Sequence, residues 1–83
     1  MTKQITVWPD DTEGRDSRKW IVSLDMVDEI GGGADGGSKT LDTHDGDGDG
    51  RDEAVAQALR EGKERGLPVV AEDEHGQAEV IRE

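Results

Sequence analysis

The stretch Lys19-Trp20-Ile21-Val22-Ser23-Leu24-Asp25-Met26 decides the fold of this chain. Its residues alternate between two faces, and the larger apolar side chains fall on one of them: Trp20, Val22, Leu24 and Met26 against Ile21, Ser23 and Asp25. A period of two over this length is typical of a β-strand that rests one face on a core. The sequence therefore predicts a strand here, with its tryptophan in the interior.

A second strand is predicted just before it. Residues 4–8, Gln-Ile-Thr-Val-Trp, alternate polar and apolar side chains and end at the turn formers Pro9-Asp10-Asp11. The polar, glycine-containing residues 11–17 then connect the two segments as a loop, so we expect them to pair antiparallel. A short extended piece over residues 39–42 is a candidate for a third strand.

Two loops rich in glycine follow. Residues 31–38 are Gly-Gly-Gly-Ala-Asp-Gly-Gly-Ser, with nothing to bury and much backbone entropy to lose, so a mobile loop is expected. Residues 43–50, which include the run His-Asp-Gly-Asp-Gly-Asp-Gly, are expected to form a second mobile loop.

The next segment has the periodicity of a helix. One apolar stripe recurs at the spacing i, i+3, i+4 and i+7, formed by Val55, Ala58, Leu59 and Gly62. Acidic residues near the start and basic residues near the end suit the helix dipole, and Asp49 or Gly50 is the expected N-cap. Gly66 followed by Pro68 predicts the end. A glycine within the stripe indicates close approach of the helix to the sheet.

The final residues predict a hairpin. Residues 68–72 and 77–82 have the composition of strands and are joined by Asp73-Glu74-His75-Gly76. The whole order predicts a single α+β domain over residues 1–83, a small antiparallel sheet of four or five strands with one helix on one face.

These features resemble the short proteins of the domain of unknown function 2188 family. The resemblance rests on the Trp20-Ile21-Val22 strand, the Glu53-Ala54-Val55 helix, the helix-ending Gly66 and the final hairpin, in which His75-Gly76 precedes Glu79-Val80-Ile81-Arg82-Glu83. It would cover nearly the whole chain, with residues 31–37 and 45–50 as insertions. The family implies the fold but no activity.

The net charge is the feature of the sequence that restricts the function most. The 83 residues carry a net charge of -11, from 21 acidic and 10 basic side chains, and no cysteine. A polyanion such as nucleic acid or an anionic membrane would be repelled, so neither is an expected partner. Acids spread along the chain, with arginine outnumbering lysine, favour a cytoplasmic protein adapted to high salt, where repulsion between carboxylates is screened.

One motif suggests a metal. Asp45, Asp47, Asp49 and Gly50 match the first half of a calcium loop, whose carboxylates converge on one cation. The position of the bidentate glutamate is Ala56, so an EF-hand is not expected. Divalent-cation binding by Asp45, Asp47 and Asp49 is nevertheless an alternative hypothesis for the function.

Other motifs do not indicate an enzyme. Residues 31–36 satisfy the spacing G-x-G-x-x-G, but no helix opens directly after them, as a nucleotide site requires. His44 and His75 are expected to be exposed to solvent, and Ser17, Ser23 and Ser38 lack the context of a nucleophile. We therefore expect a non-catalytic protein without a cofactor. It would act through protein contacts or self-association at an edge strand, with an acidic mimic of nucleic acid as a further alternative.

Overall fold

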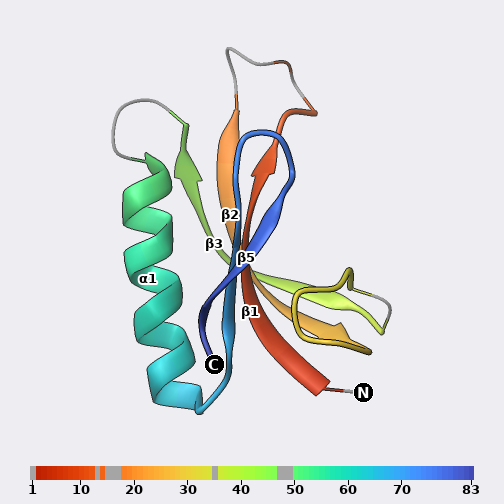
Figure 1. Cartoon of the computed structure of the whole chain (residues 1–83). Coiled ribbons are helices and arrows are strands. Elements are labelled where there is room, and N and C mark those ends of the chain that lie inside the picture. Colours follow the sequence, from red (N-terminus) through yellow and green to blue (C-terminus); the bar gives the residue numbers. More distant parts are fainter. Residues whose placement is uncertain (1, 13, 15–17, 35, 47–49) are drawn as a thin grey trace.

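The computed structural model describes residues 2–12, 14, 18–34, 36–46 and 50–83. One helix packs against a five-stranded sheet, so the predicted α+β architecture is confirmed (Figure 1). The elements are β1 (Thr2–Asp10), β2 (Lys19–Val27), β3 (Ser38–Asp45), α1 (Gly50–Arg65), β4 (Val69–Glu72) and β5 (Ala78–Arg82). Among the described residues, no helix has the length and apolar content to cross a bilayer.

The strand order is β3-β2-β1-β4-β5, and the sheet is mixed rather than wholly antiparallel. The predicted antiparallel pairs β1–β2 and β4–β5 are confirmed, but β1 and β4 run parallel, with Ile5 opposite Val69. The reason is the connection between them, because α1 carries the chain back to the end of the sheet where β1 begins and β4 then runs the same way as β1. β3 and β5 form the two edges.

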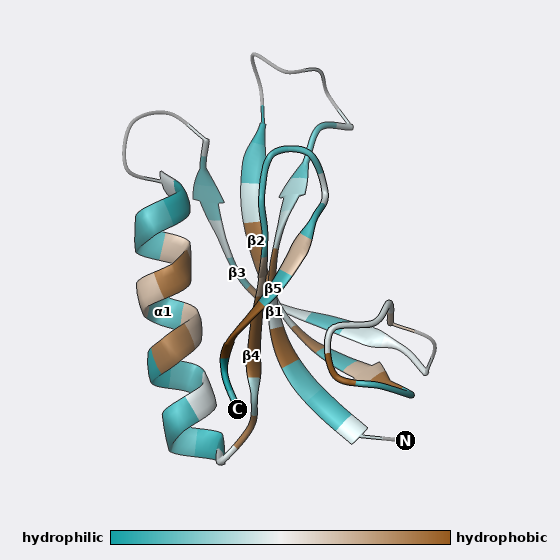
Figure 2. Ribbon diagram, in the orientation of Figure 1, coloured by the Kyte–Doolittle hydropathy of each residue, from teal (hydrophilic) through white to brown (hydrophobic). Residues whose placement is uncertain are grey.

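The core lies between the helix and one sheet face. Ile5, Val7, Trp20, Val22, Val69 and Ala71 meet the helix, which contributes only small side chains to the fully buried layer, Ala54 and Ala58. Figure 2 shows bands of apolar colour in α1 and at the middle of the strands. Since alanine adds little area, the helix must approach closely to exclude water.

Gly62 makes that approach possible. A Cβ added to it would collide with Cγ2 of Val69 and lie 2.9 Å from the carbonyl oxygen of Leu67. The predicted close contact of the helix at Gly62 is thus confirmed. The helix ends as expected at Gly66, whose φ of 67° lies in the left-handed region.

Two strands are longer than the sequence predicted. β1 continues through Pro9, where β2 is its only registered partner because β4 pairs only with residues 5–7, so the missing N–H costs little. β3 runs from Ser38 to Asp45, so residues 38 and 43–45 belong to the sheet rather than to the predicted loops. Pairing with β2 explains this extension, since His44 lies opposite Trp20.

Candidate functional site

An exposed apolar pair lies at the β5 edge of the sheet. Ile30, in the turn after β2, is 40% exposed, and Val80 of β5 is 39% exposed. The two are linked by Gly31, because a Cβ at that glycine would lie 3.8 Å from Cγ2 of Val80. They are the large hydrophobic side chains that the described part of the chain leaves exposed. We call Ile30, Gly31 and Val80 the edge patch.

The edge patch belongs to the sheet face that the helix does not cover. Val80 lies opposite Val70, whose neighbour in β1 is Thr6, and Thr6 points away from the helix. Val70 is 1% exposed, so this second face also has a buried layer. The apolar surface therefore continues from the interior of the second face to the open edge.

Polar side chains fill the rest of the second face. Gln4, Thr6, Ser23 and Asp25 are all buried there. The Asp25 carboxylate accepts hydrogen bonds from Ser23 Oγ at 2.9 Å and from Ser38 Oγ at 2.6 Å. Indole Nε1 of Trp8 donates to Ser23 at 3.1 Å. Both hydroxyls thus serve to hold a carboxylate.

The turn after β2 is tied to this polar layer by Gln4. Its Oε1 accepts a hydrogen bond from the backbone N–H of Gly31 at 2.9 Å, and its Nε2 donates to Thr6 at 2.9 Å. These bonds place the Ile30 turn against the sheet, which is how residues distant in sequence form one edge patch. A buried amide with its oxygen and nitrogen both bonded fixes local geometry well.

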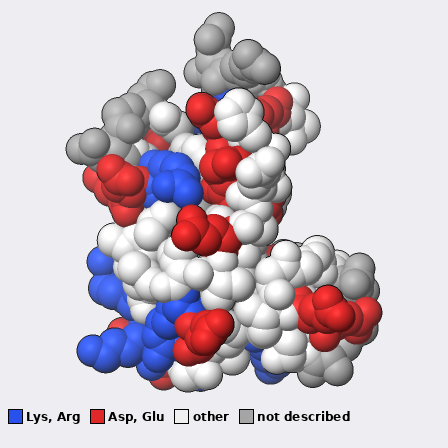
Figure 3. All heavy atoms as spheres, viewed as in Figure 1, with Lys and Arg blue, Asp and Glu red and all other residues white. Residues whose placement is uncertain are grey.

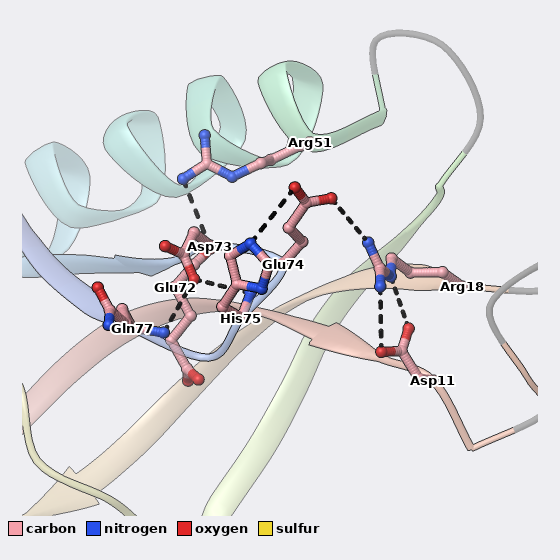
Figure 4. A network of polar contacts seen from close by, with 8 residues as sticks. All are labelled: Asp11, Arg18, Arg51, Glu72, Asp73, Glu74, His75 and Gln77. Atoms are coloured by element: carbon pink, nitrogen blue, oxygen red, sulfur yellow. Dashed lines mark hydrogen bonds and ion pairs between the residues drawn. The ribbon is translucent and has the colours of Figure 1, made fainter.

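A second polar network closes the opposite end of the sheet (Figure 4). Arg18 forms an ion pair with Asp11, at 2.6 Å, and approaches Glu74 at 3.4 Å. The hydrogen bond from Arg18 to Asp11 raises the pKa of the guanidinium. The network joins the start of β2 to the β4–β5 turn, so it anchors the hairpin that carries β5.

Asp73 shapes that turn. Its Oδ1 accepts hydrogen bonds from the backbone N–H groups of Gln77 and His75, at 2.9 and 2.8 Å, and these bonds lower the pKa of the Asp73 carboxyl. The predicted turn over residues 73–76 is confirmed, with Gly76 at φ 80°. His75 is exposed, as expected.

Arg51 connects this network to the helix. Its guanidinium lies 5.6 Å from the centre of the Trp20 ring and donates to the carbonyl oxygen of Glu72 at 3.5 Å. Partial burial raises the pKa of the Glu72 carboxyl, and Asp25 and Asp73 add to that shift by repulsion. The acidic groups near β4 are therefore not fully compensated by cations.

His44 is less exposed than the sequence predicted. Its side chain is 19% exposed, with Nε2 2.5 Å from Oε1 of Gln57 and Nδ1 3.8 Å from Glu53. The cause is the extension of β3, which brings His44 beside α1. Asp42 shares the same surface, and its pKa is lowered by hydrogen bonds from Thr43 and Gln57.

The predicted metal ligands are only partly described. Asp45 ends β3 with an exposed side chain, whereas Asp47 and Asp49 lie outside the described residues. Among the described residues, no three histidine, aspartate or glutamate side chains are grouped to hold a metal ion. Cation binding by the three aspartates stays a prediction.

The edge patch was not found from the sequence. In the sequence, nothing distinguishes Ile30 and Val80 from buried apolar residues, because their exposure depends on the strand order. Figure 3 shows acidic and basic side chains side by side at the upper left and at the lower left of the face in view, with an uncharged area between these two charged groups. Comparison of the chain with protein-family models, curated proteins and solved structures found no match.

Proposed function

We propose that this protein is a non-catalytic domain that associates with a second copy of itself in a cytoplasm of high salt content. The observation that carries the proposal is the edge patch, where two large apolar side chains adjoin an edge strand. An exposed edge strand with apolar residues is a template for pairing with another chain.

The small core supports self-association. The residues that the helix buries are two alanines and two glycines, and Trp20 is the only aromatic residue in the buried cluster of the described chain. A domain of this size buries a small share of its surface, so it is marginal when alone. Covering Ile30 and Val80 with the same residues of a second copy would add apolar burial at about 25 cal/mol per Å².

The arrangement of the serines supports a non-catalytic role. Ser23 and Ser38 both donate to Asp25, and in the described part of the chain neither hydroxyl contacts a histidine. A nucleophilic serine requires a base that takes its proton, whereas these two hydroxyls hold a buried carboxylate in place.

The charge explains why salt enters the proposal. Two molecules of charge -11 repel each other over a Debye length of about 10 Å at 0.1 M salt, and this length falls to about 3 Å at 1 M. Association through an apolar patch therefore has to compete with repulsion in dilute buffer. Concentrated potassium chloride screens most of this electrostatic repulsion.

Sedimentation equilibrium over a range of protein concentrations tests the proposal, in 0.1 M and in 2 M potassium chloride. The native chain is expected to dimerise more tightly in high salt. Val80→Lys should stay monomeric, because it places a charge on the edge patch. Thr40→Lys is the matched control, since it adds the same charge to the other edge strand, and it should dimerise like the native chain.

A native chain that is monomeric at high concentration in 2 M salt would refute self-association. Equal dimerisation by the Val80 and Thr40 variants would show that the edge patch is not the contact.

A further inference from the structure

We infer that the two copies join through antiparallel pairing of their β5 strands about a two-fold axis at Val80. This inference rests on the proposed self-association and specifies its geometry. The two five-stranded sheets would form one continuous sheet, with both helices on the same face. Three observations lead to it: the direction of the backbone groups, the charges along β5 and the position of the edge patch.

The backbone of Val80 points to the open edge. In an antiparallel pair, residues that exchange hydrogen bonds alternate with residues that do not. Asp73 donates its N–H to the carbonyl oxygen of Gln77 at 3.0 Å, so this is a hydrogen-bonded pair. Counting along the register, Ala71 and Glu79 exchange bonds, whereas Val70 and Val80 do not. The N–H and C=O of Val80 therefore point away from β4 and are available to a second strand.

Charges along β5 select the register. A two-fold axis at Glu79 would place that residue opposite its own copy, and an axis at Ile81 would place Glu79 opposite the partner's Glu83. Like charges directly opposite each other destabilise a strand pair. An axis at Val80 instead sets Glu79 opposite the partner's Ile81. The same axis lets the two Val80 residues exchange both backbone hydrogen bonds.

Arg82 supplies charge complementarity in that register. Its Nη1 donates to the carbonyl oxygens of Leu67, at 2.7 Å, and Gly62, at 3.4 Å, which fixes the guanidinium on the helix side of β5. Arg82 lies on that side although Val80 does not, because the register shifts at Ile81, between the pairs Val70–Val80 and Val69–Arg82. Glu79 lies on the same side, because it is registered with the core residue Ala71. In the Val80 register, Glu79 reaches the neighbourhood of the partner's Arg82, and the pair occurs twice by symmetry.

The apolar contact lies on the opposite side of the joined sheet. Val80 of each copy meets its equivalent there, and the turn that carries Ile30 adjoins Val80, because a Cβ at Gly31 would lie 3.8 Å from its Cγ2. The other edge strand, β3, offers no equivalent, since Ile30 and Val80 are the large hydrophobic residues exposed in the described chain.

Disulfide trapping tests this geometry without interference, since the chain has no cysteine. In a hydrogen-bonded antiparallel pair the Cα atoms lie about 5.5 Å apart, within the range that a disulfide spans. Val80→Cys should therefore form a covalent dimer on mild oxidation in 2 M potassium chloride. Thr40→Cys, on the other edge strand, should run as a monomer on gels without a reducing agent.

A spin label provides a second measurement that keeps Val80 intact. Gln77→Cys carries the label on the exposed turn before β5. In the Val80 register the two labelled positions are six residues apart along the joined strands, about 20 Å. A label distance near 20 Å supports the inference, and a distance outside roughly 15–25 Å overturns it.

The outcomes separate the inference from the proposed function. A native chain that never dimerises refutes both. A native dimer in which Thr40→Cys is trapped and Val80→Cys is not overturns the inference and leaves self-association in place.

Discussion

Replacement of Gly62 by alanine tests whether the close approach of α1 to the sheet holds the fold together. In an open helix this change stabilises by about 1 kcal/mol, because glycine has the greater backbone entropy to lose. At position 62 the added Cβ collides with Val69 Cγ2 and lies 2.9 Å from the backbone oxygen of Leu67. Val69 is completely buried, so a shift of its side chain has to displace neighbouring groups.

The clash outweighs the gain in helix propensity. Inserting a methyl group into a packed contact costs about 1–3 kcal/mol, and two simultaneous contacts, one with backbone, favour the upper part of that range. Subtracting the propensity gain of about 1 kcal/mol leaves a net loss of about 1–2 kcal/mol in the free energy of unfolding. For a domain of this size, that loss lowers Tm by roughly 4–16 °C.

Thermal and urea unfolding, followed by circular dichroism in 2 M potassium chloride, measure this change. Ala56→Gly, at an exposed helix position, is the control that reports propensity alone and should cost about 1 kcal/mol. Val69→Ala removes the colliding methyl groups, so its combination with Gly62→Ala should cost less than the sum of the single changes. A Gly62→Ala variant that is as stable as the native chain or more so would refute the close approach.

Three further predictions concern charge. Glu72→Gln should raise Tm at pH 7 and much less at pH 4, because a raised carboxyl pKa makes the folded state lose stability as pH rises from about 4.5 through the folded value; Asp28→Asn, which removes an equal charge from an exposed turn, is the control for the change in net charge. The helical circular dichroism signal at neutral pH should weaken on dialysis into dilute buffer and return with potassium chloride, since the net charge of -11 is then screened; a signal unchanged by salt would contradict the proposed adaptation. Calcium titration in concentrated potassium chloride should release no specific heat, and heat that disappears when Asp45, Asp47 and Asp49 become asparagine would establish the cation-binding alternative.

The elements were predictable because their signals are local. Alternation in residues 19–26, the Gly66 stop and the turn over residues 73–76 each depend on a few adjacent residues, and the structure confirms all three. The contact at Gly62 was also predictable from the sequence, since a glycine on the apolar stripe of a helix allows a close approach to the sheet. These parts of the fold are predicted without knowing the strand order.

The second sheet face was not predictable in the same way. Gln4 and Asp25 look like residues on a solvated face, yet they are 0% and 6% exposed. Gln4 is bonded to the Gly31 turn, which folds back onto the sheet, and Asp25 to Ser38 of β3, and no local pattern encodes either contact. The edge patch has the same origin, because the exposure of Val80 follows from the place of β5 at the end of the strand order. The parallel β1–β4 pair likewise joins segments far apart in the chain.

The parallel pairing of β1 with β4 also sets the order in which the molecule is able to assemble. The strand synthesised first lies in the middle of the sheet, with Ile5 held between Leu24 and Val69. A nascent chain can form the local β1–β2 hairpin early, but the flank of β1 stays open until α1 and β4 have left the ribosome. Such non-local closure is slow. During that interval the exposed flank of β1 is a site for unwanted pairing between growing chains, which makes the synthesis of α1 and β4 the vulnerable stage.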